Sequence, residues 1–460
     1  MAERADVIVL GMGVGGEEVA NSLAEKGLNV VGIESSLVGG ECPYFGCIPT
    51  KMMIRADDMV AEGRRIPGFA GESTVKADWT PVARRIRDVA TDNWNDRVAV
   101  ERFERKGGLF VRGAGKLAGP GKVSVNGTIY EASRAIVIST GTSPAVPPIP
   151  GLDRVTYWTN REAVKVETLP ESLVILGGGA IGVELSQVFA RFGVKVSIIE
   201  GMDRLLAMEE PEASAVLAEV LQRDGIELRL NSRAQSVEQH GDAVAVNLDG
   251  GRQVTGKALL VATGRRANLR DIGLETVGLD PAARLLDPDT HLRVGERLWA
   301  IGDVTVSGGF THMAIYHAGV AINDIMGKPG PGADYRAKPR VTFTDPEVGA
   351  AGLTEEHAKA KGINVRTGIQ KASVTSRGWI HGPGNDGFIK VVEDADHGVL
   401  VGATTMGPRG GDLLGLFELA IKLQIPSDEL RHLIYAYPTF YRGAGEAVRK
   451  LGPDEHAPMR

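Results

Sequence analysis

The sequence has almost no cysteine: the 460-residue chain contains only Cys42 and Cys47. Two thiols cannot cross-link a secreted scaffold of this length, so a disulfide-rich extracellular fold is excluded. In a cytoplasmic protein, a close pair of cysteines is more often catalytic or metal-binding than structural. The alternative is that two small buried residues lie together by chance, and the other motifs have to decide between these interpretations.

Other absences exclude whole classes of partner. No apolar run reaches the roughly 18 residues that would span a bilayer, and the segment "ADVIVLGMG" near the start reads as a strand and a turn rather than a signal peptide. The net charge is −6 and no basic run is present, which argues against nucleic-acid binding. We therefore expect a cytoplasmic protein without nucleic-acid or membrane partners.

Glycine, by contrast, is abundant, at 60 of 460 residues, about twice the usual share. Because glycine allows tight turns and close approach of the backbone to a ligand, this excess favours a ligand-binding protein. The chain is also longer than one hydrophobic core usually serves, so two to four domains are expected.

Two segments repeat one pattern of strand, glycine turn, helix and strand. They cover residues 6–34 and 172–200, and in each a terminal glutamate follows the first glycine by 23 residues. The first glycine permits the tight turn, the second lets the backbone approach a pyrophosphate, and the third allows close packing of helix on strand. The carboxylate at the end of the second strand then accepts hydrogen bonds from the ribose hydroxyls. The candidate residues are Gly11, Gly13, Gly16 and Glu34 in the first copy, and Gly177, Gly179, Gly182 and Glu200 in the second.

Two dinucleotide sites in one chain indicate FAD and a nicotinamide cofactor. The cysteine pair begins eight residues after Glu34, and a redox-active pair must touch the flavin, so FAD is assigned to the first copy. Asp303, after Gly302 at the end of a short strand, is expected to accept a hydrogen bond from a ribityl hydroxyl. Matched strand ends are expected to complete the two sites, at Thr140, Gly141 and Gly264.

Two linkers divide the chain. Residues 142–153 contain four prolines and residues 326–340 are rich in proline and glycine, which favours extended connections. The part after the second linker reads as α+β, strand-rich with two helices. We expect an α/β protein with two Rossmann-like domains and a C-terminal α+β dimerisation domain. The expected bounds are an FAD domain at 1–148, an NAD(P) domain at 149–268, a central segment completing the FAD domain at 269–335, and an interface domain at 336–460.

The motifs, in their order along nearly the whole chain, resemble the class I pyridine nucleotide–disulfide oxidoreductases, which include dihydrolipoamide dehydrogenase, glutathione reductase and mercuric reductase. The resemblance rests on "GMGVGG", "GGECPYFGCIPTK", "GGGAIGVE", "VATGRRAN", "AIGD" and "FTHMAIYHAG". It implies an FAD enzyme that uses NAD(P)H and forms a homodimer through its C-terminal domain. It also places the helix that carries His312 and His317 near the flavin.

The cysteine segment is expected to begin a helix, since Pro49 suits a first helical turn and a thiolate at a helix N-terminus is stabilised by the helix dipole. The family resemblance implies that Cys47 faces the flavin and that Cys42 meets the substrate. It also implies that Lys51 lies near the flavin and pairs with Glu184. A carboxylate at Glu200 favours NADH over NADPH, because it repels a 2′-phosphate. NADPH is the alternative, because the nearby Arg204 can accept a phosphate.

The family pattern breaks near the C-terminus. Disulfide-reducing members carry His-Pro-Thr-x-x-Glu, and this sequence has "YPTFYR", with Tyr437 and Arg442 at the histidine and glutamate positions. Tyrosine, with an ordinary pKa near 10, is a poor proton-transfer group at neutral pH. Mercuric reductase also replaces this histidine, but it delivers metal through C-terminal cysteines, and no cysteine follows Cys47 here.

We therefore expect a dihydrolipoamide-dehydrogenase-like enzyme that passes electrons from NAD(P)H through FAD to a Cys42–Cys47 disulfide and on to a small-molecule acceptor. No metal ligand set is expected. One alternative is direct reduction of a quinone, oxygen or a metal ion by the flavin, as in mercuric reductase. Another is a non-catalytic FAD redox sensor.

Overall fold

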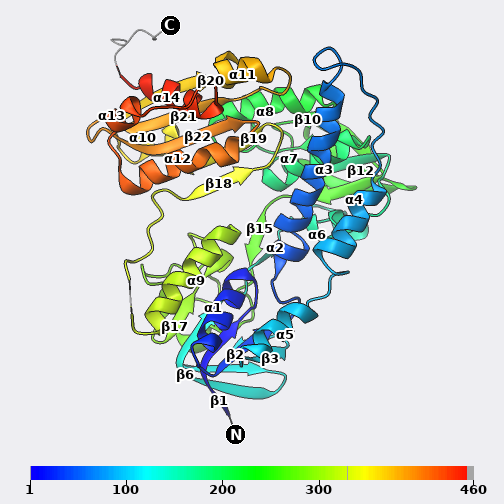
Figure 1. The fold of residues 1–460 in the computed structure, drawn as a ribbon. Helices are drawn as coiled ribbons and strands as arrows, with labels where there is room; N and C mark the ends of the chain where they lie inside the picture. The colour runs from blue at the N-terminus through cyan, green and yellow to red at the C-terminus, as the bar shows by residue number, and fades with distance from the viewer. Residues whose placement is uncertain (1, 329, 453–460) are drawn as a thin grey trace. The chain divides into compact units, whose positions relative to one another are not determined.

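The computed structural model describes residues 2–328 and 330–452 (Figure 1). The chain divides into two compact units, each assembled from stretches that are distant in the sequence. The first unit contains Met1–Thr50, Ala83–Ala145 and Gly264–Asp334, and the second contains Lys51–Val82, Val146–Thr263 and Tyr335–Arg460. Two helices, α3 (Cys47–Arg65) and α4 (Thr80–Arg85), include residues of both units.

The first unit is built on a mixed sheet of eight strands. Its main path runs β16-β17-β6-β1-β2-β3, with β5 paired to β6 and β4 paired to β5. The strands from β17 to β3 pair in parallel. Helices α1, α5 and α9 pack on one face, where α1 and α9 contact each other (Figure 1). The bounds are β1 Glu3–Leu10, α1 Val14–Glu25, β2 Val30–Glu34, α2 Glu41–Tyr44, α5 Arg97–Arg105, β3 Leu109–Arg112, β4 Lys116–Leu117, β5 Lys122–Val125, β6 Thr128–Ile138, β16 Arg293–Gly295, β17 Leu298–Ala300 and α9 Thr311–Ile325.

A second small sheet in this unit joins two distant stretches of sequence. Strands β7 (Thr142–Pro144) and β15 (Arg265–Ala267) pair antiparallel. They place the segment that follows β6 beside the segment with which the chain re-enters the first unit at Gly264.

The middle of the second unit contains a parallel sheet packed on an antiparallel one. The parallel sheet has the order β10-β9-β8-β14 and the antiparallel sheet β11-β12-β13, and apolar side chains of both form one core. The bounds are α6 Asn160–Ala163, β8 Ser172–Leu176, α7 Ala180–Arg191, β9 Lys195–Ile199, α8 Pro211–Arg223, β10 Glu227–Arg229, β11 Ala234–His240, β12 Ala243–Leu248, β13 Gln253–Gly256 and β14 Ala258–Val261.

The C-terminal part of the second unit is a five-stranded antiparallel sheet of order β18-β19-β22-β21-β20. Helices α12 and α14 share one apolar core with it. The bounds are β18 Pro339–Thr342, β19 Glu347–Gly352, α10 Glu355–Ala360, β20 Val365–Lys371, α11 Ser376–His381, β21 Phe388–Asp394, β22 Val399–Gly407, α12 Gly410–Leu423, α13 Ser427–His432 and α14 Phe440–Arg449.

The expected α/β architecture with a C-terminal α+β part is confirmed, but the expectation of two helices in that part is wrong. Its residues up to 452 form five helices, and α10, α11 and α13 each have only six residues. Such short helices show too few turns for a 3.6-residue periodicity. Two of them are started by threonine caps, at Thr354 and Thr375. Within the described ranges, no helix has the length and apolar character needed to cross a bilayer.

Candidate active site

The two glycine turns have the same backbone geometry. Gly11 has φ of +94° and Gly177 has φ of +110°, a region that residues with a side chain rarely adopt. A Cβ atom on either would lie 2.4 Å from a carbonyl oxygen at the end of a neighbouring strand, that of Ser139 or Ala262. Only glycine fits where β1 and β8 turn into their helices.

The other two glycines of each motif divide into packing and ligand-facing positions. A Cβ on Gly16 or Gly182 would lie 2.0 Å from the carbonyl oxygen of the first glycine, so these residues allow the helix to pack on the turn. Gly13 and Gly179 have no atom within 4 Å of such a Cβ. They are the N-caps of α1 and α7, and neither helix start has a side-chain cap. Open, uncapped helix N-termini of this kind fit a dinucleotide pyrophosphate.

Each terminal glutamate holds its own turn in place. Glu34 accepts hydrogen bonds from the backbone N–H groups of Met12 at 2.8 Å and Ser36 at 2.7 Å. Glu200 accepts the equivalent bonds from Gly178 at 2.6 Å and Met202 at 2.7 Å. Both carboxylates therefore lie at the turn where a ribose would bind, and both also stabilise it. Arg204 donates to the carbonyl of Ala207 at 3.0 Å.

Asp303 is held at the end of β17 by neighbours on both sides. Its carboxylate accepts from the Thr142 hydroxyl at 2.9 Å and from the Gly309 N–H at 3.2 Å. The fully buried His317 accepts from the Gly302 N–H through Nδ1 at 3.1 Å. The motif placed this histidine on the cofactor side, but no feature of the sequence indicated its backbone partner.

The remaining strand-end residues also lie in the first unit. The Thr140 hydroxyl donates to the Asn268 carbonyl at 2.8 Å, and the Gly141 carbonyl accepts from the Asn268 N–H at 2.9 Å. The Gly264 carbonyl accepts from the Ala145 N–H at 2.9 Å. These contacts join the ends of β6 and β15, so Thr140, Gly141 and Gly264 belong to the same region as Asp303.

The cysteines lie on two consecutive helices. Half-buried Cys42 is on α2, and exposed Cys47 is the first residue of α3; both side chains are thiols, not joined in a disulfide. A hydrogen bond between the two side chains, together with burial, raises the pKa of the Cys42 thiol well above its ordinary value. The Thr311 hydroxyl at the start of α9 lies 3.3 Å from Cys47 Sγ. The thiols are thus in contact with each other and close to the region of Asp303.

In the second unit, Lys51 and Glu184 form an ion pair. Lys51 Nζ lies 2.7 Å from Glu184 Oε2, and the other oxygen of this buried carboxylate accepts from the Phe343 N–H at 2.8 Å. Lys51 Nζ is also 4.6 Å from the centre of the Phe343 ring. The structure therefore brings together the two residues that the resemblance pairs, and adds Phe343 as a shared partner.

Tyr437 and Arg442 form a stacked pair at the start of α14. The Arg442 guanidinium lies 5.1 Å from the centre of the Tyr437 ring, and its Nε is 3.4 Å from Glu446. Tyr437 is 66% exposed. At this place the chain presents a phenol and a guanidinium rather than an imidazole and a carboxylate.

A buried ionic network in the second unit had no signal in the sequence. Arg191, at the end of α7, contacts Asp57 on α3 at 3.3 Å, Asp224 at 3.0 Å and Asp345 at 2.9 Å. Burial raises the pKa of Asp57 to about 8 despite the attraction of Arg191. These partners are 33 to 154 residues from Arg191 in sequence, so no local pattern relates them.

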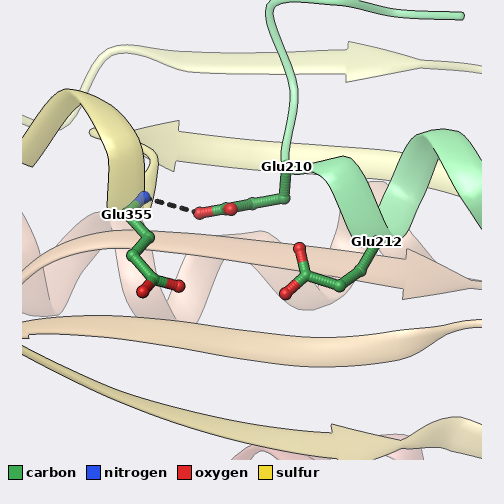
Figure 2. A group of neighbouring side chains, drawn as sticks. All are labelled: Glu210, Glu212 and Glu355. Atoms are coloured by element: carbon green, nitrogen blue, oxygen red, sulfur yellow. Dashed lines mark hydrogen bonds between the residues drawn. The ribbon is translucent and has the colours of Figure 1, made fainter. Parts of the chain in front are cut away.

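Three carboxylates that could surround a cation lie at the junction of α8 and α10. They are Glu210, Glu212 and Glu355, shown in Figure 2, where the Glu355 N–H donates to Glu210. The ammonium group of Lys390 already lies among them, at 2.9, 2.7 and 2.8 Å. Lysine therefore supplies the positive charge that these oxygens require.

Comparison with known proteins agrees with this geometry. Residues 5–321 match the family described as pyridine nucleotide-disulphide oxidoreductase, and residues 338–448 match its dimerisation domain. The chain is 32% identical to dihydrolipoyl dehydrogenase of Thermus scotoductus, over 97% of each chain. It is 30% identical to mercuric reductase of Staphylococcus aureus, over 98% of this chain and 83% of the relative.

Solved structures show the same fold. That of LpdA from Mycobacterium tuberculosis superimposes with a TM-score of 0.86 at 25% sequence identity, covering 98% of this chain and 100% of LpdA. The resemblance inferred from the motifs is thereby confirmed, and the chain belongs to the pyridine nucleotide–disulphide oxidoreductases, FAD-dependent enzymes that exchange electrons between NAD(P) and a sulfur group.

Proposed function

We propose that this enzyme takes two electrons from NADH and uses them to reduce a Cys42–Cys47 disulfide, which then reduces a small-molecule acceptor. The observation that carries this proposal is the placement of the two thiols on consecutive helices, with Cys42 on α2 and Cys47 at the start of α3 beside the Thr311 hydroxyl. FAD, when bound, would supply the two-electron transfer between nicotinamide and disulfide. The glycine turn of residues 11–16 would hold its pyrophosphate, with Glu34 at the ribose and Asp303 at the ribityl chain.

The disulfide step balances in electrons and protons. Two electrons and two protons break the S–S bond and leave two thiols. Cys47, beside Thr311, is the thiol assigned to the flavin side, and Cys42 is assigned to the acceptor. Oxidation of the pair by the acceptor re-forms the disulfide and releases the same two electrons and two protons.

The second glycine turn would bind the nicotinamide cofactor. Gly177, Gly179 and Gly182 offer the same turn as the first copy, and Lys51 with Glu184 would lie beside the reacting rings. Glu200 favours NADH because its carboxylate would repel a 2′-phosphate. Arg204, four residues after Glu200, donates one N–H to the Ala207 carbonyl, and the preference rests on Glu200.

Tyr437 and Arg442 suggest that the acceptor is not an ordinary dithiol. Reduction of lipoamide requires a proton-transfer group of neutral pKa at this position. Such a group raises the reaction rate by a factor of about 10² to 10⁴. The stacked pair lacks one, which favours an anionic acceptor or one that needs no exchange base. In the family arrangement these residues come from the partner subunit, so we infer a homodimer formed through residues 336–460. We also propose that the four domain segments are residues 1–148, 149–268, 269–335 and 336–460.

The same observation favours a second candidate, direct reduction of a quinone, oxygen or a soft metal ion without the disulfide. Anaerobic reduction by NADH and NADPH, followed by an acceptor screen for wild type and Cys42→Ser, separates the possibilities. Loss of turnover in Cys42→Ser supports the disulfide route. Turnover that survives the substitution supports the second candidate. A yellow protein that turns over no acceptor would point to a redox sensor, and a protein that binds no FAD would overturn all three.

A further inference from the structure

The segment before α5 has an unusual backbone. Asp92, Asn93 and Trp94 follow one another with φ of +46°, +55° and +56°, a left-handed conformation that disfavours every residue except glycine and, less strongly, Asn and Asp. Trp94 is the only aromatic residue with positive φ in the described part of the chain. A short π-helix, Ile86–Ala90, comes directly before, and such helices are frequent at functional sites.

The conformation is held by local hydrogen bonds. The Thr91 hydroxyl donates to the Ile86 carbonyl at 3.1 Å and accepts from the Trp94 N–H at 3.3 Å. The Asn93 N–H donates to the Arg87 carbonyl at 2.7 Å. Residues in such a conformation cost free energy and persist only where other contacts offset the cost. A glycine would form the same turn at a lower cost, so a contact that only the Trp94 side chain makes is expected.

The indole ring of Trp94 contacts the segment that carries the two cysteines. Trp94 Nε1 donates a hydrogen bond to the carbonyl of Tyr44 at 3.0 Å. Tyr44 is the buried last residue of α2, two residues after Cys42 and three before Cys47. Because α2 is a single turn, its last carbonyls lie beyond the helical ladder and need partners from elsewhere. Trp94 supplies one for the link between the two cysteines.

A second tie reaches the other side of the cysteine segment. The buried Asp96 carboxylate accepts from the Val38 N–H at 2.7 Å, and Arg112 pairs with the same carboxylate oxygen at 2.6 Å. Val38 precedes Cys42 by four residues. Residues 94 and 96 therefore hold the cysteine segment at both ends of α2.

We propose that Trp94 is a positioning residue of the cysteine pair, holding the Tyr44 carbonyl so that the Cys42 and Cys47 thiols stay in contact. The inference rests on the proposed role of these cysteines. Closing the disulfide forms one S–S bond and releases two protons and two electrons, and it is favoured when one thiol is held at high effective concentration beside the other. Loss of the Trp94 tie weakens that arrangement, so the disulfide becomes easier to reduce.

The test measures the dithiol–disulfide equilibrium in Trp94→Phe, which keeps a large ring and removes the N–H donor. The FAD-loaded enzyme is equilibrated anaerobically in dithiothreitol buffers of graded redox ratio, and thiols are counted after denaturation and alkylation. Only two cysteines exist, so every thiol counted belongs to the pair. Losing one hydrogen bond should change the dithiol–disulfide equilibrium constant by a factor of about three to ten. At 29.6 mV per tenfold change in that constant, the midpoint potential should rise by about 14 to 30 mV.

Two further variants separate positioning from general stability. Trp94→His places Nε2 where the indole nitrogen was and should restore most of the wild-type potential. Trp79→Phe is the matched control, because Trp79 Nε1 donates to the Val166 carbonyl at 2.8 Å and neither residue belongs to the cysteine segment. It should leave the potential unchanged. An unshifted Trp94→Phe, or an equal shift in Trp79→Phe, would overturn the inference. If wild type formed no Cys42–Cys47 disulfide in any buffer, the proposed function itself would fail.

Discussion

At the scale of single residues, we expect Tyr437 to limit which acceptors the enzyme can use. The phenol is exposed and lies against the Arg442 guanidinium, at the position where disulfide-reducing relatives carry a histidine. A phenol is less suited than an imidazole to take a proton from an attacking thiol. The consequence should be measurable with lipoamide, the acceptor for which a base matters most.

We expect wild type to turn over lipoamide slowly and the double variant Tyr437→His with Arg442→Glu to be faster, by up to about 10². Steady-state kinetics with NADH and lipoamide at pH 7 measures the gain. Tyr437→Phe serves as the control, because it keeps the ring and removes the hydroxyl. Rapid wild-type turnover that Tyr437→Phe leaves intact would show that no base is needed at this position.

Asp57 should make stability depend on pH in an unusual direction. Its folded pKa of about 8 lies above its ordinary value of 3.8 because the carboxyl is buried. Between these two values the folded state binds more protons than the unfolded state, so the free energy of unfolding falls as pH rises from about 4 to 8 and levels off above. Asp57→Asn should reduce this decline, and urea titrations at pH 5 and pH 8.5 measure it.

The control for this prediction is the exposed Asp242, whose pKa is lowered by Lys257. Asp242→Asn should leave the decline between pH 5 and pH 8.5 in place. If Asp57→Asn instead destabilised the protein more at pH 8.5 than at pH 5, the Asp57 carboxylate would be ionised and paired with Arg191 in the folded state.

The residues that the sequence revealed differ in kind from those that it concealed. Gly11, Gly177 and Cys47 stand in short motifs, where the spacing itself expresses a local geometric requirement. Arg191 and Lys390 take partners as far as 154 and 180 residues away in the sequence, and only the folded chain defines those contacts. Trp94 was hidden for another reason: nothing in "TDNWND" predicts three consecutive left-handed residues.

At the scale of elements, the turn from β8 into α7 separates folding from cofactor binding. A Cβ on Gly182 would lie 2.0 Å from the Gly177 carbonyl oxygen, whereas a Cβ on Gly179 would meet nothing within 4 Å. Gly182→Ala should therefore destabilise the second unit by about 1–3 kcal/mol through overpacking. Gly179→Ala should leave stability unchanged and raise KM for NADH roughly tenfold, because the added methyl group would take the space that we propose for the pyrophosphate.

Thermal unfolding and NADH kinetics on the two variants test this division. Both should retain FAD, because the first glycine turn is untouched. A normal KM in a stable Gly179→Ala would show that the second turn does not bind the cofactor.

The junction of α8, α10 and β21 depends on one buried ammonium group. Lys390 is 4% exposed and lies among Glu210, Glu212 and Glu355, which keep its pKa above the ordinary value. Lys390→Met leaves these carboxylates without their cation, and removing one partner of a buried ion pair costs about 3–5 kcal/mol. Urea unfolding at pH 7 measures the loss.

Lys359→Met is the matched control, because Lys359 is exposed and pairs with Glu355 at 2.6 Å. Surface pairs of this kind contribute less than about 1 kcal/mol. Equal losses in the two variants would mean that burial adds nothing to the Lys390 cluster.

At the scale of the whole molecule, the C-terminal part carries apolar side chains that a single chain leaves in contact with solvent. Exposed fractions are 92% for Ile434, 63% for Leu423, 54% for Leu419, 78% for Trp379 and 69% for Val374. Surfaces of this kind are typical of interaction sites, and they lie in the region that matches the family's dimerisation domain. We expect a dimer of twice 48.8 kDa in sedimentation equilibrium.

Replacing Ile434 and Leu423 together with aspartate should give a monomer that still binds FAD but has lost acceptor turnover. Leu285→Asp, at an exposed apolar position in the first unit, should remain dimeric and active. An unchanged dimer in the double variant would place the interface elsewhere.

The position of Glu200 limits how cofactor choice can be altered, whether by evolution or by an engineer. One oxygen of its carboxylate accepts a hydrogen bond from the Gly178 N–H and the other accepts one from the Met202 N–H. The side chain that would exclude a 2′-phosphate therefore also fixes the turn that we propose for the dinucleotide. An arginine at this position would add the charge that a phosphate needs and remove both acceptors at once. A route to NADPH use therefore has to install a second acceptor for those two amides before it exchanges the charge, which makes the order of substitutions as important as their identity.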